Sequence, residues 1–573
     1  METLTCIIYF VFTLLLIFSI SYFFKTKLDI KMEFSIVFSI SFIICFLYIF
    51  SLIKLLLIGT IILKLFGLIL LLYYLIKKPK DFIKTYHTKS ILTFLVLFFT
   101  LSLTLSHVKI LDFDNFSHWL VIARQMFELN NLPDASNILT TYYDYPPGSA
   151  YLIYFFAQFT SNFEYMAILA QTIFEILLLL PIFIFARNNF QYIISCIMII
   201  FFLVLDISTA DLLVDSLLGI FVFNTFMLIY YYKNDLKKLL KLLIPFNLTL
   251  LLLKNVAIFF YGIEFILLII IFFKRKIPFK NCLKNIFLFL IPAFFFILWK
   301  IRNKIVFASI GFLPAQSVSL TNYKANLEEK SLSDIAQIFK NFTSNLFDIH
   351  NLFAILFIII LILSIIFMFK INKNNRKDKL SYFTFIILIY FGYALLLFVS
   401  YLISMTTYEA LNLACFDRYF LTGMFLLVGM SVILYFNQNN NSKILNIIIS
   451  TCLIICIFTS PNSAHLIGIR NDKESDRMYV ENVIGNYKKG NDKVLVISPK
   501  SKESGLIKFC TTYFLGSRDY KLIINTDELE KIKINDYDTI IIYETNKDVN
   551  TFMSNVKNYN KTKGLYKVGD DSD

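Results

Sequence analysis

Charged residues are scarce in this sequence: Asp, Glu, Lys and Arg together make up 16% of its 573 residues. Its eight cysteines include no CxxC pair and no zinc-type spacing, and no segment repeats at a fixed period. Residues 461–573 contain no glycine-rich loop of the kind that cradles a phosphate. These absences exclude a cysteine-ligated zinc module, a repeat array and a phosphate-binding loop in the C-terminal part.

Hydrophobic residues dominate instead, at 58% of the chain with 17% aromatic, and apolar runs recur from Thr3 almost to Pro461. A helix needs ~20 apolar residues to cross a bilayer core, and an unbroken series of such runs is typical of helical membrane proteins. The sequence therefore predicts a mainly α, polytopic transmembrane protein. About fourteen crossings are expected, at 3–24, 34–53, 55–76, 90–106, 166–186, 191–206, 214–232, 242–253, 256–273, 285–299, 351–370, 381–404, 420–436 and 444–460.

The formal charge of +14 could indicate a nucleic-acid partner, but the cations lie in short loops between apolar runs. Such loops mark the cytoplasmic side of a membrane protein, so we expect a membrane-lipid environment and no nucleic acid. The first run follows Glu2 and lacks a basic leader, which predicts a retained anchor and not a signal peptide. If all basic loops are cytoplasmic, both termini are external to a bacterial cell membrane, with the loops 107–165, 207–213, 254–255, 300–350 and 405–419.

One apolar run, residues 148–160, is too short for a comfortable crossing. If it crossed, every later basic loop would become external. We therefore expect an interfacial or re-entrant helix there, started by Pro146 and Pro147, which fix the entry of the chain.

The character of the chain changes after Pro461, where charge rises and short apolar runs appear at 493–498 and 538–544. Such runs are typical of strands, and the segments between them could form short helices. Residues 461–573 therefore predict a small external α/β domain.

Polar residues gather in the predicted external loops, first in "LDFDNFSHW". Asp112 and Asp114 directly follow a crossing, and the simplest interpretation is that Asp114 or Asn115 caps an amphipathic helix. Asp114 and His118 are also four residues apart, which places them on one helical face, and a carboxylate beside an imidazole suits acid–base chemistry.

A second acidic group, Asp206, Asp211 and Asp215, flanks the next external loop. Interfacial capping would explain one or two of these residues. Asp215 lies at or inside the predicted crossing 214–232, where an ionised group is costly and usually functional.

Two cations complete the external set. Lys254 interrupts the apolar run around it and predicts a hairpin tip; it is either a snorkelling anchor or a partner for an anionic ligand. Arg418 stands at the start of a late crossing, where Asp417 could pair with it, although a guanidinium also binds phosphate well. Trp299, Lys300 and Arg302 begin the loop 300–350, which could clamp an acceptor or a lipid.

These segments together resemble the GT-C superfamily, the integral-membrane glycosyltransferases that use polyprenyl- or dolichyl-phosphate-linked sugars. "DNFSHW" resembles the superfamily's acidic first-loop motif, which favours Asp114 over Asp112, and "LLVDSLLG" resembles its second-loop Asp motif, at Asp215. Three other segments match motifs of the superfamily. "DYPPGSAYLIYFF" points to Asp144 and Tyr145 as site residues, "LLLKNVAIF" points to Lys254, and "FDRYFL" points to Arg418 and Tyr419.

The resemblance covers about 90–460, and it implies a catalytic region there, with additional helices at 1–89 and the α/β domain at 461–573. It implies transfer of a sugar from a polyprenyl-phosphate donor to a glycan, lipid or protein acceptor in cell-envelope assembly. Asp114 would be the base or would orient the acceptor, and Asp215 would support the acceptor or a metal. Lys254 and Arg418 would hold the phosphate, with Asp144, Tyr145, Tyr419 and His118 around it.

Three points stay open from the sequence. A divalent metal could take part, with His118, His350 and His465 as scattered candidate ligands. A polysaccharide polymerase or ligase would also join lipid-linked sugars outside. A lipid-linked oligosaccharide flippase would instead place ionisable residues near the bilayer midplane, and a receptor or scaffold would need no acidic loop beside the membrane.

Overall fold

A computed structural model describes residues 2–205, 210–311, 314, 319–348, 376–437, 443–460, 472, 474–502 and 504–568. The described chain is mainly helical, with one small sheet near its C-terminus. This agrees with the predicted class, a polytopic helical protein that carries a C-terminal α/β unit.

Ten stretches of helix within the described residues are long and apolar enough to cross a membrane. They comprise α1 (Glu2–Leu28), α2 (Met32–Leu52), α3 (Leu56–Lys77), α5 (Lys89–Thr104) with its 3₁₀ extension η1 (Leu105–His107), α8 (Phe163–Leu179) with α9 (Ile182–Phe185), α11 (Asp215–Tyr232), α13 (Ala257–Lys274), α14 (Phe279–Val306), α18 (Arg376–Ile403) and α20 (Phe416–Phe436). The chain is therefore a multi-pass membrane protein.

Among the described residues, three of the predicted crossings do not correspond to helices that are long and apolar enough to span a membrane. Those at 191–206 and 444–460 correspond to shorter helices, α10 (Asn189–Leu205) and α21 (Lys443–Thr459). The one at 242–253 is part of α12 (Leu236–Leu253), whose first turns carry three lysines. The crossing predicted at 351–370 lies outside the described residues.

The remaining elements are short. In the membrane region they are α4 (Pro79–Tyr86), η2 (Asn115–Trp119), α6 (Leu120–Leu129), α7 (Gly148–Ala157), α15 (Leu320–Glu328), α16 (Leu332–Leu346) and α19 (Thr407–Leu411). In the C-terminal part they are α23 (Asp476–Ile484), η4 (Pro499–Lys502), α24 (Gly505–Leu515), η5 (Thr526–Lys531), η6 (Ile534–Asp536), α25 (Lys547–Phe552) and η7 (Met553–Asn555).

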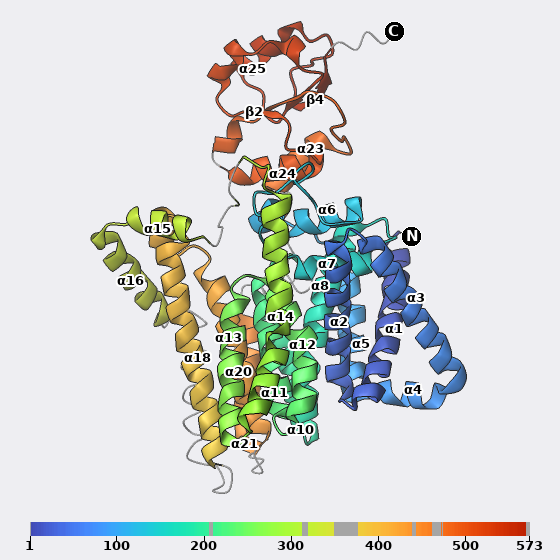
Figure 1. Ribbon diagram of the computed structural model, residues 1–573. Coiled ribbons are helices and arrows are strands. Elements are labelled where there is room, and N and C mark those ends of the chain that lie inside the picture. The colour runs from blue at the N-terminus through green and yellow to red at the C-terminus, as the bar shows by residue number, and fades with distance from the viewer. Residues whose placement is uncertain are drawn as a thin grey trace.

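The two ends of the helical bundle differ in the loops they carry. Helices α6, α7 and α15 lie near the end that bears the C-terminal domain, and α4 lies toward the opposite end (Figure 1). Basic loops meet away from the domain: Lys238 Nζ lies 3.1 Å from Asp29 Oδ2, and Arg275 donates to the Asn234 carbonyl at 3.1 Å. Loops that are basic in the sequence are thus neighbours in space, as a single cytoplasmic face requires.

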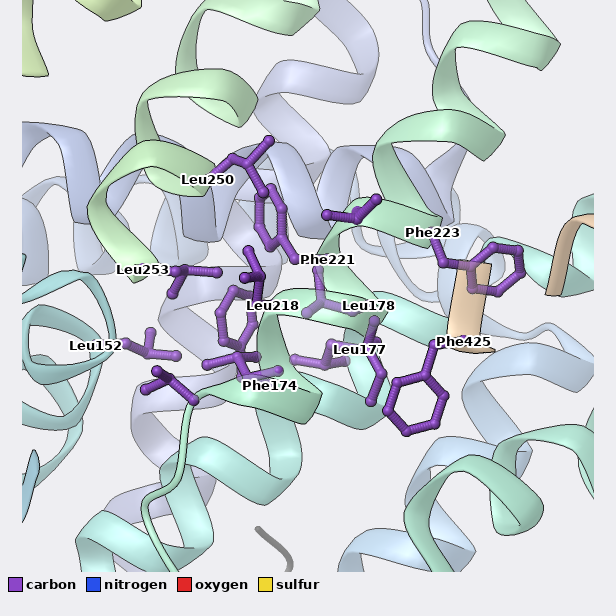
Figure 2. Packing of buried hydrophobic residues seen from close by; sticks show 14 of the residues in the cluster. Leu152, Phe174, Leu177, Leu178, Leu218, Phe221, Phe223, Leu250, Leu253 and Phe425 are labelled. Carbon is purple, nitrogen blue, oxygen red and sulfur yellow. The ribbon is translucent and has the colours of Figure 1, made fainter. Parts of the chain in front are cut away.

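The short helix predicted at 148–160 exists as α7, which starts after Pro147 and spans ten residues. All ten are buried, so α7 lies among other helices instead of resting on the bundle. A Cβ added at Gly148 would stand 2.4 Å from the Leu252 carbonyl oxygen, so glycine is what lets α7 approach the end of α12. Leu152, Phe174, Leu218 and Leu253 pack where α7, α8, α11 and α12 meet (Figure 2).

The C-terminal domain has a four-stranded sheet of β1 (Val494–Ile497), β2 (Lys521–Ile523), β3 (Thr539–Ile542) and β4 (Gly564–Lys567). The strand order is β2-β1-β3-β4, with β1 parallel to β2 and β3, and β4 antiparallel to β3. Strands β1 and β3 lie within the predicted segments 493–498 and 538–544 and are entirely buried, as short apolar runs indicate.

This domain docks on the segment that leads into the first acidic loop. Arg477 on α23 is 2% exposed; it donates to Glu164 Oε2 at 2.8 Å and to the Ile110 carbonyl at 3.0 Å. The Phe113 ring lies edge-on to Phe509 of α24, with centroids 5.0 Å apart. The C-terminal domain therefore contacts the chain on both sides of Asp112.

Candidate functional site

Arg418 is the centre of a charged cluster that joins three distant segments. Its guanidinium lies 2.5 Å from Asp114 Oδ2 and 3.2 Å from Asp215 Oδ2. The side chains of Arg418 and Asp215 are 10% and 4% exposed, so the pair is shielded from water. The sequence allowed a surface pair with Asp417, but Arg418 instead faces inward to the other two carboxylates.

Lys254 extends this cluster. It stands in the turn between α12 and α13, as the predicted hairpin tip, and its Nζ binds Asp215 Oδ1. Asp215 Oδ1 thus binds Lys254, and Asp215 Oδ2 lies 3.2 Å from Arg418 Nε, a charge contact in which neither atom completes a hydrogen bond. The buried carboxylate therefore lies between two cations.

Close helix packing explains why Asp215 and Arg418 meet. Both lie in the first turns of their helices, α11 and α20, and Thr422 Oγ1 donates to the Asp215 carbonyl at 3.1 Å. One turn further along, a Cβ on Gly219 would stand 2.9 Å from the Thr422 backbone. Glycine at this position keeps the two helix starts together.

The first acidic loop is shaped by its own hydrogen bonds and not by helix capping. The Asp114 side chain makes no capping bond to the following helix; its carboxylate pairs with Arg418 instead. Asp112 Oδ1 accepts the Asp114 backbone N–H at 2.8 Å. Asp211 Oδ1 accepts Asn115 Nδ2 at 3.0 Å, and Asn115 Oδ1 accepts the Leu212 N–H at 3.0 Å, so Asn115 ties the two acidic loops together.

A second ion pair lies beside the first and was only partly indicated by the sequence. Asp144 pairs with Lys300, at 2.7 Å between Oδ2 and Nζ, and Lys300 also donates to Asn255 Oδ1 at 3.0 Å. Lys300 belongs to α14, which continues to Val306, so it is not in a loop as predicted. In the sequence, only the position of Lys300 at the end of an apolar run, next to residues predicted to be external, could have indicated a contact with Asp144.

Aromatic rings pack around the cations. Lys254 Nζ lies 4.8 Å from the centre of the Tyr419 ring, within the range of a cation–π contact. Tyr145 packs against His118 and Trp119, with centroids 4.9 and 5.3 Å apart. All of the residues taken from the resemblance therefore lie in one region of the molecule.

His118 is held by its neighbours in the chain and by aromatic rings. The helix there begins with a π turn over Asn115–Trp119. His118 Nδ1 lies 2.7 Å from Ser117 Oγ, and the ring lies in an aromatic cluster. Burial, with Lys254 and Arg418 nearby, lowers the pKa of His118 well below its ordinary value and keeps the ring neutral.

A cavity of about 490 Å³ connects the charged cluster to the apolar helices. Part of its wall is polar, formed by Asp215, Lys254, Asn255, Lys300, Tyr145 and Tyr419. The rest is mostly apolar and comes from the start of α13 and the last three turns of α18, including Phe259, Leu396, Leu397 and Ile403. Ile258 and Val399, also in the wall, are 51% and 37% exposed, so the cavity opens on the outer side of the bundle.

Within the described residues, no group of three or more His, Cys, Asp or Glu side chains is arranged to hold a metal ion. His350 and His465, two of the candidate metal ligands, lie outside that part of the chain, as does Asp206. The carboxylate oxygens of the charged cluster are paired with lysine and arginine side chains.

Comparison with known proteins adds no assignment: no family model matches the chain, no curated protein matches it, and no solved structure matches it.

Proposed function

We propose that this protein is a membrane glycosyltransferase of the GT-C type. It would transfer a sugar from a polyprenyl-phosphate donor to an acceptor on the external face of a bacterial cell membrane, in the assembly of cell-envelope glycans. The observation that carries this proposal is the 490 Å³ cavity, which joins two lysines to an apolar channel that opens on the side of the bundle.

A lipid-linked phosphate has the two properties that this cavity complements. Its hydrocarbon chain would lie along the apolar wall of α13 and α18 and leave through the opening beside Ile258 and Val399. Its phosphate would lie beside Lys254 and Lys300, which are already held in place by Asp215 and Asp144. Cations positioned before the reaction stabilise negative charge as it develops on the leaving phosphate.

The proposed chemistry is a direct displacement at the anomeric carbon. An acceptor oxygen or nitrogen attacks that carbon while the bond to the phosphate oxygen breaks. The phosphate leaves without strong acid help, so the protein must supply cations for the phosphate and a base for the nucleophile. Asp114 and Asp215 would hold Arg418 and Lys254, and Tyr145 and Tyr419 would line the sugar end of the cavity.

One observation favours the flippase alternative. Glu175 on α8 and Glu264 on α13 are completely buried in the middle of spans, where ionisable groups mark transport pathways. The external cluster has no evident use in transport, so we retain the enzyme as the first proposal. Transfer and flux are separate measurements, and they distinguish the two.

The first prediction concerns donor use. Purified full-length protein in lipid nanodiscs is expected to release polyprenyl phosphate from at least one member of a panel of undecaprenyl-phosphate sugars. Lys254→Ala should reduce this release by roughly 10²-fold or more, the effect of removing a preorganised group that binds developing charge.

Lys280→Ala is the matched control, because Lys280 is an exposed lysine in the first turn of α14, outside the cluster. Equal losses in both variants would contradict a specific phosphate role for Lys254. Lipid flux without any sugar transfer would replace the enzyme with the transporter.

A further inference from the structure

Asp112 differs from the other carboxylates around the site because no cation pairs with it in the described part of the chain. Asp114 pairs with Arg418, and Asp144 pairs with Lys300. Asp215 contacts both Lys254 and Arg418. Asp112 makes no ion pair within the described residues; its Oδ1 accepts the Asp114 N–H at 2.8 Å. As a residue, Asp112 is half-buried and keeps some exposure to solvent.

The groups that face Asp112 are mostly of its own charge. They are the carboxylates of Asp114 and Asp211 and, further off, the guanidinium of Arg418, which is already bound by two other acids. Burial first, and then Asp114 and Asp211, raise the pKa of Asp112 to about 6. A carboxylate of this kind is ionised at neutral pH and accepts a proton more readily than an ordinary one.

Asp114 has the opposite environment. Its Oδ2 is occupied by an ion pair with Arg418, at 2.5 Å. Holding Arg418 next to Asp215 is the role that its geometry supports.

We propose that Asp112, two residues before the carboxylate favoured by the sequence, accepts the proton of the acceptor. This inference rests on the proposed function. The acceptor hydroxyl oxygen forms a bond to the anomeric carbon, and its proton moves to Asp112 Oδ2. The bond between that carbon and the lipid-phosphate oxygen breaks, and its electron pair stays on the phosphate beside Lys254 and Lys300.

The position of Asp112 suits an acceptor that arrives from outside. The chain before it is held by Arg477 of the C-terminal domain through the Ile110 carbonyl, and the residue after it, Phe113, packs on Phe509 of the same domain. Asp112 is thus held between the membrane region and the external domain. Asp112 is not part of the donor-cavity wall, but a short chain of contacts connects it to that wall: it accepts the Asp114 N–H, Asp114 pairs with Arg418, and Arg418 lies 3.2 Å from Asp215, which lines the cavity.

The test is the pH dependence of transfer by the full-length protein in nanodiscs, with whichever undecaprenyl-phosphate sugar the wild type uses. Wild-type turnover should fall below pH of about 6, because Asp112 becomes protonated and cannot accept a proton. Asp112→Asn should lower turnover by roughly 10²–10⁴-fold and remove this acid limb. Asp112→Glu should keep the limb at reduced rate.

Asp114→Asn is the matched control, with the same chemical change two residues away. It should raise the KM for the donor through displacement of Arg418 and should retain the acid limb. An acid limb that survives in Asp112→Asn, or that disappears in Asp114→Asn alone, would overturn the assignment. A wild type that uses no lipid-phosphate donor would overturn the proposed function and this inference together.

Thermal unfolding separates a catalytic loss from a folding defect. Because the folded protein raises the pKa of Asp112 above its ordinary value, protonated Asp112 favours the fold, and that contribution is lost as pH rises through about 6. Asp112→Asn, which mimics the protonated form, should therefore keep or raise the unfolding temperature at pH 7.5. A lower unfolding temperature at that pH would make Asp112 a structural residue and overturn the proposal.

Discussion

Arg418 shows how a single residue organises the site. Two nitrogens of its guanidinium lie against different carboxylates, Nη2 at 2.5 Å from Asp114 and Nε at 3.2 Å from Asp215, and the single ammonium of a lysine cannot hold both positions. Breaking a buried ion pair by removing one partner typically costs about 3–5 kcal/mol, because an uncompensated charge is left behind.

We therefore expect Arg418→Lys to lower the unfolding temperature and to reduce transfer by at least about tenfold, since the fork is lost while the charge is kept. Turnover and thermal unfolding measured on the same preparation check this. Arg275→Lys is the control, because Arg275 lies in an exposed basic loop at 3.1 Å from the Asn234 carbonyl. Normal behaviour of Arg418→Lys would mean that the fork geometry is unimportant.

The packing of α11 on α20 is the decisive feature at the scale of elements. Gly219 and Gly429 lie along this contact, where an added Cβ would stand 2.9 Å from the Thr422 backbone and 2.4 Å from the Phe223 ring. The contact brings Asp215 to Arg418, and therefore the second acidic loop to the late helix start.

Gly219→Ala should separate α11 from α20 and weaken the ion pair between Asp215 and Arg418. The expected result is a lower unfolding temperature together with reduced transfer. Gly262→Ala, within α13, is a matched control, because a Cβ there meets no atom within 4 Å. That change should be neutral or stabilise by up to about 1 kcal/mol. A similar response of both variants would show that the α11 and α20 contact tolerates a methyl group.

At the scale of the whole molecule, the C-terminal domain and the membrane region meet through Arg477. Besides its contacts to Glu164 and Ile110, its Nε lies 3.1 Å from Glu481, which in turn pairs with Lys109 at 2.9 Å. Burial by itself lowers the pKa of Arg477, but Glu164 and Glu481 outweigh it and raise the pKa above its ordinary value, so the residue stays charged.

Arg477→Ala should therefore loosen the docked domain, because Glu164 and Glu481 lose their shared partner. We expect faster limited proteolysis between α21 and α23, measured by the appearance of a fragment of the domain's size. Lys521→Ala, on the exposed start of β2, should not change the cleavage rate. An unchanged rate in Arg477→Ala would indicate that aromatic contacts such as that of Phe113 with Phe509 hold the domain by themselves.

Many features of this protein are local in the chain and could be predicted from it. The apolar runs predicted the ten spans found in the described residues. The prolines before Gly148 predicted the start of the short helix α7, and the short apolar runs after Pro461 predicted β1 and β3. Lys254 at a hairpin tip and Arg418 at a helix start were also correct, because an isolated cation is costly inside an apolar span and is favoured where the span ends.

The partners of these residues depend on contacts between distant segments, and only the tertiary structure decided them. The sequence favoured Asp114 over Asp112 and considered Asp417 for Arg418, but helix packing gave Arg418 to Asp114 and Asp215 and left Asp112 without a cation in the described chain. The contacts of His118 with Ser117 and with the Tyr142 ring likewise came only from the structure. Hydrophobic patterns fix where a chain crosses a membrane, whereas the charge environment of each carboxylate depends on which helices pack together.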